Sequence, residues 1–257
     1  MTRGGPSRFR RQPEARALVL GHRGARHAAP ENTFAAFELA RTEGADGIEL
    51  DVRLDAEGNV IVLHDPALTR VTGGASTERA QDVPLARLLT LDVGGGERVP
   101  LLRDVLHWVR EQDACVNVEL KSDLRDRAGL VRRVAELLAR EPELSERVLL
   151  SSFHPGMVLA LARALPGFDV NWLVHAKQRV FRGAPAWHCL GAAGVNPEHT
   201  LLSLGRVRAW RRQGALLGTW TVNDPQLAAA YAAFGVDAVI SDCPGKVLAA
   251  VGKARAE

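Results

Sequence analysis

The chain has 257 residues, of which 46% are hydrophobic and 25% charged, so it can build one large domain or two small ones. Its 33 basic residues outnumber its 30 acidic residues by too little to indicate a nucleic-acid partner. No apolar run is long enough to span a membrane, and the three cysteines are far apart and odd in number. We therefore expect neither stable membrane insertion nor a disulfide framework.

Residues 1–16 are polar, rich in arginine and without the apolar centre of a secretory signal. We expect them to form a disordered basic arm, with contact to an anionic partner as the alternative. The missing signal and the unpaired cysteines favour a cytoplasmic location.

The first expected strand is the continuous apolar run of residues 17–20, which is typical of a strand buried on both faces. Pro-Glu-Asn-Thr at residues 30–33 then opens a helix whose apolar positions begin at Phe34.

The second expected strand carries two acids. Within residues 48–52 apolar residues alternate with Glu49 and Asp51, so both carboxylates point to the same face. A polar turn signal follows, and then a short apolar strand, residues 60–63, that ends at His64. If the two strands pair around this turn, Asp51 falls roughly opposite His64.

Residues 66–100 interrupt the alternation with two glycine clusters and one short helical pattern near residues 85–89. We interpret this segment as an insertion after the second strand, because long loops in compact domains tend to be functional.

From Leu101 the alternation is regular, apart from an irregular region at residues 177–193. Expected helices and strands follow one another to the end of the chain, with helices at 102–111, 127–140, 155–165, 201–213, 225–234 and after 241, and strands at 116–120, 148–152, 170–174, 194–196, 215–221 and 238–241.

Eight strand–helix units within residues 17–257 predict an α/β fold, a (β/α)8 TIM barrel with a small insertion after the second strand. A doubly wound open sheet is the alternative. No G-x-G-x-x-G follows the first strand, so a dinucleotide site has no support.

Polar side chains gather at the ends of the expected strands. In a barrel all these ends lie at one rim, where such enzymes place their chemistry, and randomly scattered surface charges would not prefer them. The residues are His22 and Arg23, Glu49 and Asp51, Glu119 and Lys121, Ser151 to Phe153, Asn196, and Trp220 and Asn223.

The three acids Glu49, Asp51 and Glu119 form a hard oxygen site that suits one divalent cation, Mg²⁺ or Ca²⁺, rather than zinc. Buried salt bridges with Arg23 and Lys121 are the alternative for each acid alone. Three acids beside two cations nevertheless leave room for a metal ion.

Arg23 and Lys121 beside such an ion indicate an anionic substrate, most plausibly a phosphate. His22 and His64 then supply a possible acid/base pair. Trp220 could close a pocket over a small polyol or fill the top of the barrel. For the other six histidines the sequence indicates no carboxylate partner: His27, His107, His154, His175, His188 and His199.

These motifs resemble those of the glycerophosphodiester phosphodiesterase family, over nearly the whole chain from about residue 18 to 248. Any one motif is weak, but all of them in the same order are highly specific. They are H-R-G at 22–24, P-E-N-T at 30–33, E-L-D-V at 49–52, H-D at 64–65, N-V-E-L-K at 117–121, S-S-F at 151–153 and W-T-V-N at 220–223.

The resemblance implies a metal-dependent phosphodiesterase that hydrolyses glycerophosphodiesters to glycerol 3-phosphate and an alcohol. It implies a divalent ion on the three acids, His22 and His64 as the catalytic acid/base pair, and Arg23 and Lys121 on the phosphate. Glu31 and Asn32 would support these groups, with Glu31 orienting Arg23. Gly218 departs from the family pattern, where a bulkier residue is usual, and the insertion is short.

Three alternatives stay open. Lysophospholipase D-type hydrolysis of lysophospholipids would need an apolar groove, a metal-dependent barrel lyase or isomerase would use a similar set of residues, and a catalytically silent binding protein would be expected to lack an acid or a histidine. The expected partner is a small-molecule glycerophosphodiester. The leaving alcohol, the oligomeric state and the assignment of acid and base to the histidines are not decided.

Overall fold

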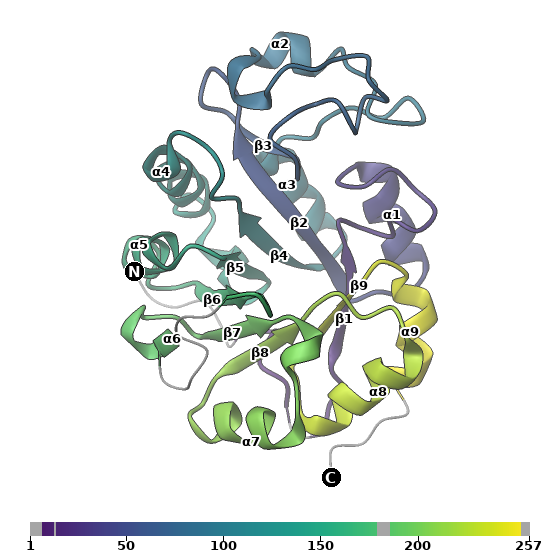
Figure 1. Ribbon diagram of the computed structural model, residues 1–257, viewed down its shortest axis with the longest axis vertical. Coiled ribbons are helices and arrows are strands. Elements are labelled where there is room, and N and C mark those ends of the chain that lie inside the picture. Colours follow the sequence, from purple (N-terminus) through teal and green to yellow (C-terminus); the bar gives the residue numbers. More distant parts are fainter. Residues whose placement is uncertain (1–6, 13, 179–185, 253–257) are drawn as a thin grey trace.

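Nine strands among the described residues join into one sheet that closes on itself and is surrounded by helices (Figure 1). The structure is a computed structural model and describes residues 7–12, 14–178 and 186–252. The strands are β1 (Leu18–His22), β2 (Gly47–Leu54), β3 (Val60–Val62), β4 (Cys115–Leu120), β5 (Val148–Ser152), β6 (Asp169–Val174), β7 (Gly194–Pro197), β8 (Leu216–Thr219) and β9 (Ala238–Ser241).

The ring closes because β1 pairs in parallel with both β2 and β9. The expected (β/α)8 barrel is thus confirmed, and an open doubly wound sheet is excluded. The helices are α1 (Phe34–Thr42), α2 (Leu85–Leu88), α3 (Leu102–Glu111), α4 (Arg127–Leu138), α5 (Pro155–Ala164), α6 (Ala186–Cys189), α7 (Leu204–Arg212), α8 (Pro225–Phe234) and α9 (Pro244–Val251).

Local sequence signals set several helix ends. Thr33 caps α1 by accepting a hydrogen bond from the backbone N–H of Ala36, and Asp224 does the same for Gln226 at the start of α8. Gly235 ends α8 in the left-handed conformation, with a φ of 100°. The region expected to be irregular, residues 177–193, contains the short helix α6, and residues 179–185 lie outside the described residues.

The alternation along each strand decides where the polar groups go. In β4, Val116, Val118 and Leu120 belong to the main apolar cluster between strands and helices. The alternate residues face the barrel interior and change from apolar to acidic toward the rim, in the order Cys115, Asn117, Glu119. The chemistry therefore lies at the carboxyl ends of the strands, above an apolar floor.

The segment before β1 differs from the disordered arm that the sequence predicted. Phe9 is fully buried in an apolar cluster with residues near the amino ends of the strands, including Leu20, Cys115 and Leu216. Nearby, the backbone N–H of Arg11 donates to Asp237 (3.0 Å). The polar composition of this segment does not reveal the burial of its single aromatic residue. That residue nevertheless covers the bottom of the barrel. Residues 1–6 and 13 lie outside the described residues.

Replacing Phe9 by Ala should lower the free energy of unfolding by about 3 kcal/mol, because it leaves a cavity in a closed apolar cluster. Urea unfolding of the two proteins measures the difference. Arg10→Ala is the matched control, since this half-exposed neighbour makes only surface contacts that contribute less than about 1 kcal/mol. A Phe9→Ala protein as stable as the control would show that Phe9 does not stabilise the bottom of the barrel.

The hairpin after β2 forms, but its register differs from the expected one. Val52 pairs with Val62, so Asp51 lies opposite Leu63, whose N–H donates to the Asp51 carbonyl (2.9 Å). The buried Arg53 fixes the next residue by donating twice to the carbonyl of His64, at 2.6 and 2.8 Å. β2 also continues three residues beyond Asp51, so the acids lie within the strand rather than at its end.

The insertion, residues 66–100, extends from the end of β2 and β3 at one side of the barrel (Figure 1). It contains α2 and one turn of 3-10 helix, Ala80–Asp82. It is held by a small apolar cluster of its own, separate from the main cluster: Ile61, Leu63, Leu68, Ala80, Val83, Leu88, Val99 and Leu101. In the ranges that the structure describes, no helix is long and apolar enough to cross a membrane.

Candidate active site

A cavity of about 270 Å³ opens at the carboxyl end of the barrel, and most of the predicted site residues line it. Asp51 does not line this cavity but contacts Arg23 and Lys121, which do. The lining residues are His22, Arg23, Glu49, His64, Asn117, Glu119, Lys121, Phe153, Leu173, His175, Trp220, Thr221 and Ile240.

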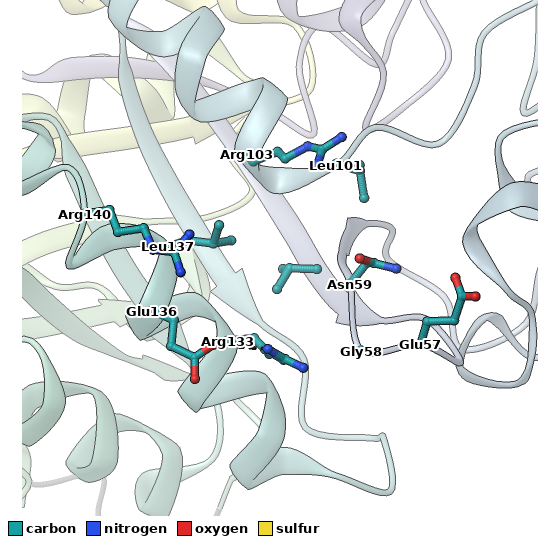
Figure 2. Close-up of a pocket in the computed structure, with 10 residues that line it drawn as sticks. Glu57, Gly58, Asn59, Leu101, Arg103, Arg133, Glu136, Leu137 and Arg140 are labelled. Atoms are coloured by element: carbon teal, nitrogen blue, oxygen red, sulfur yellow. Dashed lines mark hydrogen bonds and ion pairs between the residues drawn. The ribbon is translucent and has the colours of Figure 1, made fainter.

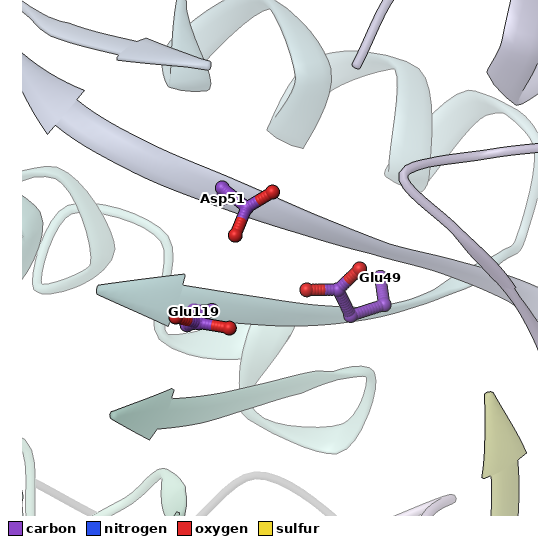
Figure 3. A group of neighbouring side chains, drawn as sticks. All are labelled: Glu49, Asp51 and Glu119. Carbon is purple, nitrogen blue, oxygen red and sulfur yellow. The ribbon is translucent and has the colours of Figure 1, made fainter. Parts of the chain in front are cut away.

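Three buried carboxylates come together on the inner wall (Figure 3). Glu49 and Asp51 share the inner face of β2, and Glu119 lies beside Asp51 on β4, where the two residues are paired in register. One oxygen from each carboxylate lies within 4.8 Å of the others. The spacing of the acids along the two strands therefore produces the predicted cluster.

Two cations accompany the acids. Arg23 Nε lies 3.1 Å from Asp51, and Lys121 Nζ lies 3.3 Å from Asp51 and 2.8 Å from Glu119. Burial alone would raise the pKa of Asp51, but Lys121 and Arg23 outweigh it and hold that pKa well below its usual range. The salt bridges anticipated as an alternative are thus present, on two of the three acids.

Glu49 is the one of the three acids with which neither Arg23 nor Lys121 forms a salt bridge. It accepts a hydrogen bond from the backbone N–H of Arg23 (3.1 Å), and burial together with the charges of Asp51 and Glu119 raises its pKa well above the usual value. The buried Asn117 Oδ1 faces the same cavity and has no hydrogen-bond partner among the described residues. Excess negative charge and a spare oxygen are what a hard divalent cation would satisfy, so these residues fit such an ion.

Each predicted catalytic histidine is held by a carboxylate. His22 Nδ1 lies 2.6 Å from Asp242 Oδ1, and His64 Nδ1 lies 2.6 Å from Asp65 Oδ1. In both rings Nε2 is therefore the nitrogen left for the cavity. Burial lowers the pKa of His64, although the charge of Asp51 opposes that change.

Glu31 and Asn32 lie where the sequence suggested, next to the charged groups. Glu31 accepts from a terminal guanidinium nitrogen of Arg23 at 2.9 Å. Asn32 Nδ2 donates to Asp51 Oδ2 at 3.0 Å, and its backbone adopts a left-handed φ of 58°. Both residues thus fix groups that themselves face or flank the cavity.

Aromatic side chains form the opposite wall of the cavity. Trp220 meets Phe153 edge to face at 5.4 Å and His175 at 5.9 Å between ring centroids, and its indole N–H donates to the carbonyl of Asn196 (2.8 Å). Trp220 therefore lines the cavity rather than only filling the top of the barrel. Gly218 leaves space for the Asn196 side chain, because a Cβ there would lie 2.6 Å from its oxygen.

Sequence reasoning missed two residues of this site, Asp242 and His175. Three histidines to which it gave no carboxylate partner also have one: Glu43 for His27 (3.2 Å), Glu111 for His107 (2.9 Å) and Glu198 for His175 (3.2 Å). The signal for Asp242 and His175 was available. They directly follow the last and the fifth strand of the barrel, the two strand ends from which no candidate was taken.

A second cavity, of about 240 Å³, contains none of the predicted site residues. It lies between α4, the start of α3 and the turn that joins β2 to β3 (Figure 2). Arg133 and Glu136 on its wall form an ion pair of 3.2 Å. Its mixed charges and exposed arginines distinguish it from the buried acid cluster.

Asp242→Asn should lower the free energy of unfolding at pH 7, because it removes the charge that pairs with His22. Partial exposure screens this carboxylate, so we expect the loss to be only about 1–2 kcal/mol. Burial opposes its ionisation, but hydrogen bonds from His22 and Asn223 hold the pKa of Asp242 at about 2 instead of 3.8. A carboxylate with a lowered pKa contributes stability above pH 3.8 and loses it as the pH falls toward 2. The gap between wild type and variant in the free energy of unfolding, measured with urea, should therefore narrow below about pH 4. A gap that does not narrow there would contradict the assignment.

The chain matches the Glycerophosphoryl diester phosphodiesterase family over residues 22–246. It belongs to this family. The resemblance stated from the motifs is confirmed, as is the enzyme class it implied, a phosphoric diester hydrolase. A glycerophosphodiester phosphodiesterase of Caldanaerobacter subterraneus is 30% identical over 248 residues, covering 93% of this chain and 99% of the relative.

Solved structures of the family have the same fold. A protein from Silicibacter pomeroyi is 26% identical with a TM-score of 0.86, covering 96% of this chain and 97% of its own. A phosphodiesterase from Oleispira antarctica, solved in complex with the product sn-glycerol-3-phosphate, is 29% identical with a TM-score of 0.83 and covers 92% of this chain and 97% of its own. The barrel and its length are therefore those of the family.

Proposed function

We propose that this family member is a metal-dependent phosphodiesterase that hydrolyses glycerophosphodiesters to glycerol 3-phosphate and an alcohol. The observation that carries the proposal is one cavity in which two carboxylate-held histidines flank a buried acid cluster with two cations. The product complex of the Oleispira relative supports the choice of glycerol 3-phosphate as one product.

Glu49, Asp51 and Glu119 would hold one divalent cation, Mg²⁺ or Ca²⁺. Bound there, the ion would supply a Lewis acid and a template for the phosphate. Carboxylate oxygens without thiolates or several imidazoles favour these hard cations over zinc. The acid cluster does not discriminate between the two ions.

Arg23 and Lys121 bind the phosphate and stabilise the charge that develops on its oxygens during the reaction. Asp51 contacts both cations, and Glu31 and Glu119 each contact one, so their positions are set before substrate arrives. Charges that are already oriented cost no reorganisation when the reaction occurs.

His22 and His64 share the proton transfers through Nε2. One accepts the proton of the nucleophile, a water or the neighbouring glycerol hydroxyl, and the other protonates the leaving alkoxide. Asp242 and Asp65 keep each ring in place through Nδ1. The geometry is compatible with either assignment of acid and base.

Trp220 and Phe153 would cover the apolar edge of a small substrate. The cavity of about 270 Å³ is near the lower end of the roughly 300–1,000 Å³ usual for small-molecule sites, which suits a glycerophosphodiester with a small alcohol. A lysophospholipid would need an apolar groove beyond it. The exposed large apolar side chains of the described residues are Leu89, Leu204 and Leu227, which come from different elements and form no such groove.

The decisive experiment measures release of glycerol 3-phosphate from glycerophosphocholine, glycerophosphoethanolamine and glycerophosphoglycerol, each with Mg²⁺, Ca²⁺ or EDTA. We expect release with at least one diester and one ion, and none with EDTA. A lysophospholipid, assayed by release of acyl-glycerol 3-phosphate because its glycerol stays acylated, tests the alternative substrate class. No release from any diester with either ion would refute the proposal.

A further inference from the structure

One arginine of the insertion reaches back to the rim of the barrel and contacts two carboxylates there. Arg70 Nε lies 2.5 Å from Asp65 Oδ2, and its two terminal nitrogens donate to the two oxygens of Glu31 at 2.6 and 3.0 Å. The planar guanidinium is suited to bridging two carboxylates, whereas an ammonium would contact them as a point charge.

Each of these carboxylates also contacts a residue of the proposed reaction. Asp65 uses its second oxygen, Oδ1, on the His64 ring (2.6 Å), while Glu31 also accepts from Arg23 (2.9 Å). Arg70 is thus one residue removed from the histidine that transfers a proton and from the arginine that binds phosphate.

We propose that Arg70 is a positioning residue, which holds His64 through Asp65 and Arg23 through Glu31 at the same time. The proposal rests on the function proposed above. It assigns the insertion a part in the reaction, although the acids, both cations and His22 come from the barrel strands or directly follow them.

Arg26 is in a comparable position but contributes less. It lies 3.6 Å from Glu31 and 3.4 Å from Asp242, the carboxylate that holds His22. Asp242 is also held by Asn223, whose Nδ2 donates to it at 2.8 Å. Asp65 Oδ2, by contrast, contacts only Arg70 within the part of the chain that the structure describes. Loss of Arg70 therefore frees the His64 carboxylate, whereas loss of Arg26 does not free that of His22.

A purely structural role for Arg70 would give a different result. Its side chain is 49% exposed, and ion pairs of exposed side chains contribute little to stability. A shift of a catalytic group by about 1 Å, however, can cost about 100-fold in rate. Activity and stability should therefore respond very differently to its removal.

The test compares kcat and KM for glycerol 3-phosphate release by the wild type, Arg70→Ala, Arg70→Lys and the control Arg87→Ala. Arg87 lies in the same insertion, is 52% exposed and pairs with Glu78 at 2.6 Å, and neither residue lines the cavity. We expect Arg70→Ala to lower kcat by about 10- to 100-fold and to raise KM, with Arg70→Lys intermediate and the control unchanged. The unfolding temperature of Arg70→Ala should fall by less than about 4 °C.

A double-mutant cycle identifies the route. If Arg70 acts on His64 through Asp65 and on Arg23 through Glu31, then Arg70→Ala lowers kcat by a smaller factor in the Asp65→Ala enzyme than in the wild type, and it lowers kcat no further once Glu31→Ala is added to Asp65→Ala. The proposal would be overturned if the effects of Arg70→Ala and Asp65→Ala on kcat multiplied in full. It would also be overturned by an active Arg70→Ala enzyme that is indistinguishable from Arg87→Ala. If Arg70→Ala failed to fold, Arg70→Lys would carry the same comparison. A wild type that is inactive on every diester would instead refute the proposed function, and this inference with it.

Discussion

His64→Ala lowers kcat by about 10²- to 10⁴-fold while the barrel stays folded, which is the range expected when a general acid or base is lost. The imidazole is partly exposed at the cavity wall and belongs neither to the main apolar cluster nor to that of the insertion, so its removal leaves the fold intact. Arg23, Lys121 and the acids remain, so KM should change much less than kcat. Steady-state kinetics of glycerol 3-phosphate release measures both quantities.

His107→Ala is the matched control for this variant. His107 is an exposed histidine on α3 that also pairs with a carboxylate, Glu111, at 2.9 Å, but it does not line the cavity. We expect it to retain the wild-type rate. A His64→Ala enzyme that works at the rate of the control would remove His64 from the reaction.

Chelation of divalent ions should abolish activity, and Glu119→Gln should raise the metal concentration needed for half-maximal activity by about 10- to 100-fold. The substitution keeps the shape of the side chain but removes one of three buried negative charges beside two cations. The remaining charge is too small to bind a hard divalent cation equally well.

Thermal unfolding provides a readout that does not depend on activity. A ligand that binds only the folded state stabilises it by about 2.7 kcal/mol at 100 times its dissociation constant, so Mg²⁺ or Ca²⁺ should raise the unfolding temperature of the wild type. Glu119→Gln should show a much smaller rise, whereas Asp104→Asn, at an exposed acid on α3, should respond as the wild type does. An unfolding temperature and a rate that are both indifferent to EDTA would refute the metal site.

The alternation of apolar and polar residues, together with their positions along the strands, was enough to predict most of the candidate site. The alternation around Glu49 and Asp51 and the acid at the end of β4 place three carboxylates on the inner wall, because parallel strands in register bring such positions together. The same rule, applied to the strands that end before His175 and Asp242, would have found both residues.

Other features depend on contacts that no local pattern records. The hairpin register is one residue from the expected one, and Arg53 holds the His64 carbonyl in the observed position. Arg70 and Glu31 are 39 residues apart in the chain, and their ion pair has no periodic signal. Phe9 is the single aromatic residue of a polar segment, so the composition of that segment does not indicate the apolar cluster that Phe9 joins.

The separate apolar cluster of the insertion has a consequence for heat resistance. His64 and Asp65 directly follow Leu63 of that small cluster, and Arg70 lies within the insertion, whereas the acids belong to the continuous ring of strands. Cooperative units with fewer buried contacts open at a lower free-energy cost than the whole protein, and amide hydrogen exchange reports such openings. Catalysis should therefore fail on warming through partial opening of the insertion, at temperatures where the ring and its acid cluster are still intact.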